Sequence, residues 1–196
     1  SGHVRIYQYN NNSWSQLGSD IEGEAANDIS GHSVSLSSDG SRVAIGAPIN
    51  DGTSGNSNDN RGHVRIYQYN NNSWSQLGAD IDGEATDDQS GWSVSLSSDG
   101  SRVAVGAYNN DGAGYNSGHV RIFDYTPSGT SSWTQVGGDI DGEAAEDRSG
   151  YSVSLSSDGS RVAIGAYDAN GGSDSGHVRI FDYTPSGTSS WTQVGG

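Results

Sequence analysis

The chain has 196 residues and a net charge of −15, with nine arginines, no lysine and no cysteine. A surface of this sign disfavours nucleic acids and anionic membranes, which attract positive charge. No apolar run approaches the roughly 20 residues of a membrane-spanning helix. The lack of cysteine excludes disulfides and thiolate metal sites.

The sequence is a tandem repeat in which two hairpin patterns alternate. A first hairpin at 1–18 is followed by an acidic connection at 19–30, a second hairpin at 33–47 and a variable loop at 48–61. This order then recurs with variable loops at 108–117 and 167–175. Matching tryptophans at 14, 74, 133 and 191 give periods of 60, 59 and 58 residues. Units of this length with four short strands each are typical of propeller blades.

The predicted secondary structure is entirely β, because apolar residues alternate with period two and no window has helical periodicity. The expected strands are 3–9, 13–17, 33–37, 42–47, 63–69, 73–77, 93–97, 102–107, 119–125, 133–136, 152–156, 161–166, 177–183 and 191–194. Asp39-Gly40 and its copies lie between alternating runs, which predicts a hairpin with a type I′ turn.

Three separated elements of this repeat carry a family resemblance. Ser-Gly-x-Ser-Val, a turn, Val-x-Ile-Gly-Ala-Pro, a loop and Gly-x-Val-x-Ile-Tyr follow one another most clearly in 30–48 and 62–67. This order resembles the FG-GAP repeat of integrin-α-like β-propellers, and the resemblance covers the whole chain. The phenylalanine of the "FG" pair is serine here, and the proline of "GAP" is present only at Pro48.

The resemblance implies a β-propeller built of four-stranded antiparallel blades. Residues 1–18 would form half a blade, followed by blades at 19–78, 79–137 and 138–196, about three and a half in all. The half blade lacks its two inner strands, so we expect further blades or another chain to complete it. The family suggests a closed ring of seven blades or a longer array.

Near-identical repeats differ at few positions, and these suggest a binding surface. One variable position follows the Ser-Gly pair and another follows Gly-Ala; the resemblance places both, with the variable loops, on the upper face of a propeller. Aromatic rings among Asn and Asp suit the recognition of a protein or glycan ligand. The candidate ligand-binding residues are His32, Trp92, Tyr151, Tyr108, Tyr115 and Tyr167. The alternative is neutral drift after duplication.

The acidic connections offer candidate metal ligands, exemplified by Asp80, Asp82, Glu84 and Asp88. Alternate carboxylates on a turn can chelate calcium. We favour the alternative that the Asp before Ser-Gly bonds loop amides, so no metal or other cofactor is expected. The histidines at 3, 63, 119 and 177 recur at one strand position, which indicates packing.

No nucleophile elbow, zinc-protease motif or phosphate loop is present, so we expect no enzyme activity. Asn11 and Asn71 begin N-glycosylation acceptor sequences in predicted turns. The predicted function is ligand binding or adhesion by a secreted or cell-surface module. The alternative is a purely structural repeat of a surface filament or extracellular matrix. Neither nucleic-acid binding nor membrane insertion is expected.

Overall fold

The computed structural model describes residues 1–52, 58–127, 132–168, 175–185 and 190–195. These residues form antiparallel strands and no helix, so none of them belongs to a helix that could cross a membrane. Parts of the variable loops predicted at 48–61 and 167–175, and of the turns near 130 and 188, lie outside the described residues.

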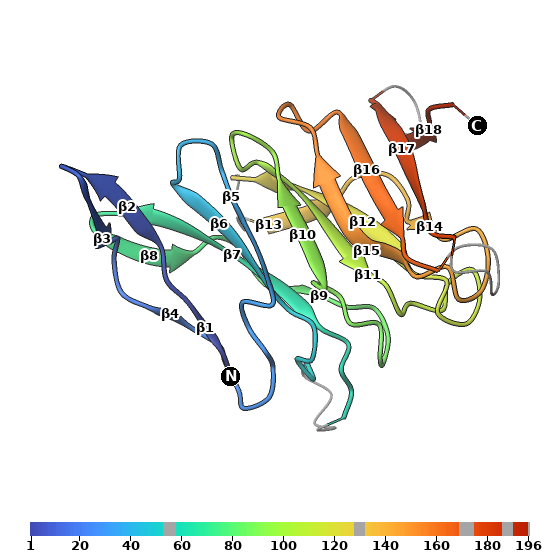
Figure 1. Ribbon diagram of the computed structural model, residues 1–196, viewed down its shortest axis with the longest axis horizontal. Coiled ribbons are helices and arrows are strands. Elements are labelled where there is room, and N and C mark those ends of the chain that lie inside the picture. The colour runs from blue at the N-terminus through green and yellow to red at the C-terminus, as the bar shows by residue number, and fades with distance from the viewer. Residues whose placement is uncertain (53–57, 128–131, 169–174, 186–189, 196) are drawn as a thin grey trace.

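Three antiparallel sheets, each with a main path of four strands, follow one another along the long axis of the molecule (Figure 1). The first consists of β5 (Ser33–Leu36), β6 (Arg42–Ala47), β7 (His63–Asn70) and β8 (Ser73–Gln76). The second consists of β10 (Ser93–Leu96), β11 (Arg102–Ala107), β12 (His119–Thr126) and β13 (Ser132–Gln135). The third consists of β15 (Ser149–Leu155), β16 (Arg161–Ala166), β17 (His177–Thr184) and β18 (Ser190–Gln193). In each, the strands pair in chain order.

The N-terminal segment forms two separate two-stranded sheets, together called the partial sheet, at the end of the molecule opposite the third sheet (Figure 1). It holds β1 (His3–Val4), β2 (Tyr7–Asn10), β3 (Ser13–Gln16) and β4 (Ile21–Glu22). β2 pairs with β3, and β1 pairs with β4. The strand predicted at 3–9 is therefore interrupted at Arg5 and Ile6.

The acidic connections contain short strands that the sequence pattern did not predict. β9 (Ile81–Asp82) pairs with the beginning of β7, and β14 (Ile140–Asp141) pairs in the same way with β12. One apolar residue in each pair is buried, Ile81 and Ile140. Each connection is thus anchored to the third strand of the sheet it leaves.

The hydrophobic core lies between neighbouring sheets. Val64 and Ile66 of β7 pack against Val94, Leu96 and Val103 of the second sheet. The second and third sheets repeat this contact through Ile122, Leu155 and Val162 among others. A third cluster joins Ile6 and Ile21 to β6.

Glycine permits the close approach of the inner strands. A Cβ atom built on Gly46 or Gly106 would overlap the carbonyl oxygen of Gly91 or Gly150 in the next sheet. The second strand of each of these two repeats therefore needs a residue without a side chain at this position.

Repeated polar contacts also join the sheets. Ser33 Oγ donates to the Gly91 carbonyl, and Ser93 Oγ donates to the Gly150 carbonyl. The indole N–H groups of three equivalent tryptophans donate to main-chain carbonyls of the preceding unit, in the pairs Trp74–Leu17, Trp133–Leu77 and Trp191–Val136.

The turns differ from the prediction in type. Only Gly40 of the Asp39-Gly40 pair has a positive φ, 70°, so this is not a type I′ turn. The carboxylate of Asp39 instead accepts hydrogen bonds from Ser37 Oγ and from the amide of Ser41. Type I′ geometry occurs at Asn11-Asn12, where both φ angles are positive and Asn10 pairs with Ser13.

Candidate functional site

The variable aromatic residues gather at one end of the inner hairpins. His32 and Trp92 directly precede β5 and β10, while Tyr151 lies in β15. Tyr108 and Tyr167 directly follow β11 and β16. Because β10 pairs antiparallel with β11, and β15 with β16, the start of one strand meets the end of the next. We call this the upper end; the Asp-Gly turns lie at the opposite, lower end.

A tight turn precedes His32, Trp92 and Tyr151 and fixes the direction of each of these side chains. The amide of Trp92 donates to the Gln89 carbonyl at 3.2 Å, and those of His32 and Tyr151 make the equivalent bonds. Gly91 has a φ of 84° and its position faces the carbonyl oxygen of His63. The Ser-Gly pair of the repeat is therefore explained by a left-handed residue with no space for a side chain.

Five of the six predicted residues form one contiguous aromatic row. The ring centroids of His32 and Trp92 are 4.2 Å apart, and those of Trp92 and Tyr108 are 4.4 Å apart. Tyr151 lies 5.7 Å from Trp92 and stacks on Tyr167 at 5.1 Å. His32, Tyr151 and Tyr167 are exposed, and Trp92 and Tyr108 are half-buried. We call these five residues the aromatic row.

Tyr115, the sixth candidate, is exposed and lies in a separate hollow of about 310 Å³. Amides, carboxylates and a hydroxyl line this hollow together with the ring, from residues Thr86, Asp87, Gln89, Asn109, Asp111 and Asn116. A second hollow, of about 380 Å³, is bounded by Tyr151 and Tyr167 at the end of the row.

Two polar side chains beside the row were missed by the sequence analysis. Arg148 precedes the third Ser-Gly pair by one residue, and its charge acts on the Tyr108 hydroxyl. Arg148 Nε and Asp168 Oδ1 are buried and have no hydrogen-bond partner among the described residues. Both residues differ from their equivalents in the other repeats; the residues equivalent to Arg148, for example, are Ile29 and Gln89. This variation between repeats is the sequence feature that could have identified them.

Burial changes the ionisation of groups near the upper end. It raises the pKa of Tyr108, an effect that the nearby Arg148 partly offsets. It also raises the pKa of Asp88, although the carboxylate accepts hydrogen bonds from the amides of Glu84 and Ala85. These bonds confirm the expectation that the Asp before Ser-Gly holds its own loop.

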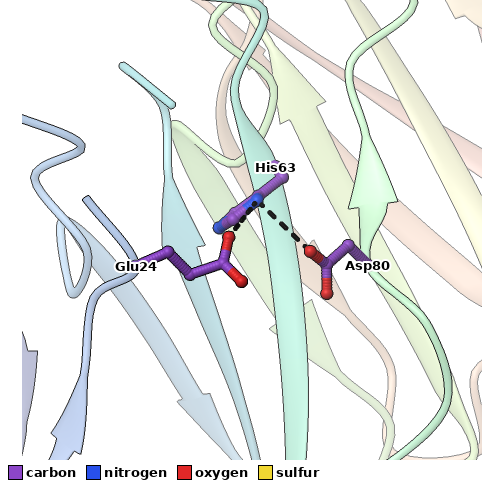
Figure 2. A group of neighbouring side chains, drawn as sticks. All are labelled: Glu24, His63 and Asp80. Carbon is purple, nitrogen blue, oxygen red and sulfur yellow. Dashed lines mark ion pairs between the residues drawn. The ribbon is translucent and has the colours of Figure 1, made fainter. Parts of the chain in front are cut away.

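The structure separates the four acidic candidates. Asp88 is buried in its turn, and Asp82 is an exposed residue of β9. Asp80 instead lies beside His63 and Glu24, as Figure 2 shows, with one oxygen 3.7 Å from His63 Nδ1. Glu84 lies in an equivalent group with His119 and Asp139. His63 and His119 are thus buried, as expected, but they also face carboxylates, whereas His177 is half-buried and His3 is exposed.

The lower end is acidic and uniform. A hollow of about 390 Å³ is lined by a Ser-Asp pair from each repeat, at 38–39, 98–99 and 157–158. The glycosylation candidates Asn11 and Asn71 are exposed in their turns.

Comparison with known proteins supports the resemblance over part of the chain. Residues 79–123 match the family model of the FG-GAP repeat. No curated protein matches the chain.

Two solved structures share the fold. One is a "putative 6-phosphogluconolactonase" from Bacteroides uniformis, with a TM-score of 0.64 and 12% identity over 98% of this chain and 47% of that one. The other, of the same description, is from Bacteroides fragilis, with a TM-score of 0.62 and 15% identity over 99% of this chain and 48% of that one. The chain therefore spans about half the length of these two proteins. The common feature is a propeller-like arrangement of antiparallel sheets.

Proposed function

We propose that this chain is an arc of a β-propeller that binds a neutral glycan at its upper end without catalysing a reaction. The aromatic row carries the proposal. Five rings from three sheets lie next to one another, although the segments 33–47, 93–107 and 152–166, which follow the first variable position of each repeat, are nearly identical. Aromatic faces bury large areas with few rotors to immobilise, and they stack on the apolar faces of sugars.

The polar groups around the row favour a glycan over an apolar peptide. The hollow beside Tyr115 presents amide and carboxylate groups that can donate to or accept from sugar hydroxyls. The charge of −15 disfavours acidic glycans.

A catalytic role receives less support. The two similar structures are described as lactonases, but identities of 12% and 15% relate only the folds. A sugar phosphate is an anion, and the net charge of this chain repels it. We expect no hydrolysis of 6-phosphogluconolactone above the buffer rate; turnover that is lost in an Arg148→Ala variant would overturn this assignment.

A glycan array tests the binding function. The chain should retain one class of neutral glycan, and Trp92→Ala should weaken that binding by about 1 kcal/mol or more. Trp14→Ala is the matched control, because Trp14 is 68% exposed and lies on the outer hairpin of the partial sheet. Binding that survives Trp92→Ala together with Tyr151→Ala would contradict the proposal, as would retention of peptides alone.

A structural role in a filament or matrix is the second candidate, and the exposed sheet faces at the two ends of the arc support it. Val34 and Leu36 are exposed at one end, and Val178 and Ile180 at the other. Their equivalents inside the molecule are covered by a neighbouring sheet. Further blades or another chain would cover these faces. Concentration-dependent assembly in light scattering, without glycan binding, would favour this role.

A secreted or cell-surface location fits both candidates. The acidic, lysine-free surface suits an extracellular setting, and two glycosylation acceptors lie in exposed turns. Expression through a secretory host should add glycan mass, which Ser13→Ala and Ser73→Ala should each reduce. Unchanged mass in wild-type protein would remove this support.

A further inference from the structure

Two groups of histidine and carboxylate side chains occur at equivalent junctions between neighbouring units. The first contains Glu24, His63 and Asp80, and the second contains Glu84, His119 and Asp139. In each, the Glu comes from the connection before the sheet, the His begins the third strand, and the Asp precedes the short strand that pairs with it. One potential ligand atom from each residue lies within 4.8 Å of the other two.

The imidazoles are buried and directed at the carboxylates. The side chains of His63 and His119 are 2% and 1% exposed. His63 Nδ1 lies 3.8 Å from Glu24 Oε2 and 3.7 Å from Asp80 Oδ2, from opposite sides (Figure 2). Both distances are too long for a hydrogen bond. In the second group, His119 Nδ1 is 4.0 Å from Glu84 Oε2, and His119 Nε2 is buried with no hydrogen-bond partner among the described residues.

Each carboxylate has one oxygen directed at the histidine, and its other oxygen lies beside an Arg or Gln side chain. Glu24 Oε1 faces Arg65 Nη1 at 3.4 Å, and Asp80 Oδ1 accepts a hydrogen bond from Gln76. This leaves Oε2 and Oδ2 directed at His63. The second group repeats the arrangement, with Arg121 Nη1 3.6 Å from Glu84 Oε1 and Gln135 donating to Asp139 Oδ1 at 2.7 Å. Donors of this kind orient carboxylate ligands around metals.

The spacing of the three facing atoms suits a metal ion better than a shared proton. Donors around a tetrahedral zinc ion, each about 2.1 Å from the metal, lie roughly 3.4 Å apart. The separations of 3.7 and 3.8 Å around His63 exceed this by a few tenths of an ångström. Glu24 and Asp80 are 46% and 30% exposed, so their side chains have room to rotate and the centre is open to solvent.

Charge points in the same direction. Two carboxylates face each imidazole, and a single arginine on the far side of the Glu balances one of them. One imidazole with two carboxylates is a ligand set for zinc and similar transition ions, whereas calcium prefers oxygen alone.

We propose that the Glu24–His63–Asp80 and Glu84–His119–Asp139 groups each bind one zinc ion or a similar divalent transition ion, with water completing the coordination. Each ion would join the connection of one unit to the third strand of the next sheet. It would therefore stabilise the junction between units, independently of glycan binding at the upper end.

The test is a calorimetric titration of the 196-residue chain with zinc, after treatment of the protein with a chelator. Wild-type protein should bind two ions, His63→Gln should bind one, and the His63→Gln/His119→Gln double variant should bind none. His177→Gln is the matched control, because His177 has a single carboxylate, Glu143, within 4 Å in the described part of the chain. It should still bind two ions.

The histidines are buried, so replacing them could disturb folding, and a second set of substitutions is needed. Glu24→Gln and Glu84→Gln, combined in one protein, change exposed side chains and should weaken zinc binding at least tenfold at both sites. Cobalt(II) should give a saturable visible absorption in wild-type protein that these variants lose. Zinc stoichiometry that stays at two in the double histidine variant would overturn the proposal, as would equal competition by calcium.

Discussion

At the scale of single residues, the distance between neighbouring sheets depends on glycine. Gly106 lies where a Cβ atom would overlap the Gly150 carbonyl, and nothing lies within 4 Å of a Cβ on Gly138. Neither glycine has a positive φ. The difference between them is therefore a difference in space rather than in backbone strain.

Gly106→Ala should lower the free energy of unfolding by about 1–3 kcal/mol, because the added methyl group forces the inner strands apart. Urea denaturation of Gly106→Ala and of the control Gly138→Ala measures the effect. Equal stabilities of the two variants would show that the inner strands have room that the structure does not indicate.

Acid should weaken the lower-end turns. Hydrogen bonds from Ser41 and Ser37 lower the pKa of Asp39 to about 2, and those from Ser156 and Ser160 do the same for Asp158. A free Asp has a pKa of 3.8. Because the folded-state pKa is lower than the unfolded one, this stabilisation is complete above about pH 4 and is lost as the pH falls towards 2.

The melting temperature should therefore fall more between pH 5 and pH 2.5 in wild-type protein than in an Asp39→Asn/Asp158→Asn variant. Calorimetry at the two pH values measures both. Parallel decreases would mean that other carboxylates control the acid response.

Variation between repeats pointed to residues that the structure brings together, whereas contacts that depend on the fold could not be predicted. The residues at 32, 92 and 151 differ between repeats and their rings lie in one row, but ligand binding by them stays a prediction. Arg148 was missed because its role depends on Tyr108, 40 positions earlier in the chain. His63 was assigned to packing because its carboxylate neighbours come from two different connections.

At the scale of secondary-structure elements, alternation of apolar residues was sufficient to place the main strands. It could not place β9 or β14, since two residues are too few to show a period, and their pairing depends on the partner strand. It also assigned the type I′ turn to Asp-Gly, whereas the asparagine pairs adopt it. Asn tolerates positive φ well enough to replace the expected glycine.

The tryptophan of the fourth strand connects each unit to the preceding one. Trp133 Nε1 donates to the Leu77 carbonyl at 2.8 Å, and the ring packs on the core between the first and second sheets. Trp133→Phe should cost about 0.5–1.5 kcal/mol for the hydrogen bond, plus a contribution from lost packing. Trp14→Phe, at the exposed equivalent position, should lower the free energy of unfolding by less, as measured by urea denaturation of both variants. A larger loss of stability in Trp14→Phe than in Trp133→Phe would show that the Trp133 contact is not the stabilising one.

At the scale of the whole molecule, the same side chain has different surroundings in the middle and at the end of the arc. Ile122 is 1% exposed between two sheets, and its equivalent Ile180 is 39% exposed on the last sheet. Ile122→Ala should destabilise the 196-residue chain by about 2–5 kcal/mol, and Ile180→Ala by much less. Equal costs would show that the terminal face is covered in solution, for instance by a second copy.

Tryptophan fluorescence tests the location of the binding surface most directly. Four of the five tryptophans occupy the fourth-strand position, and Trp92 is the one in the aromatic row. Titration with the best-retained neutral glycan should change the emission of wild-type protein and of Trp133→Phe to saturation. Trp92→Phe keeps an aromatic ring for stacking but should lose the signal. An undiminished signal in Trp92→Phe would place the ligand away from the upper end and contradict the account.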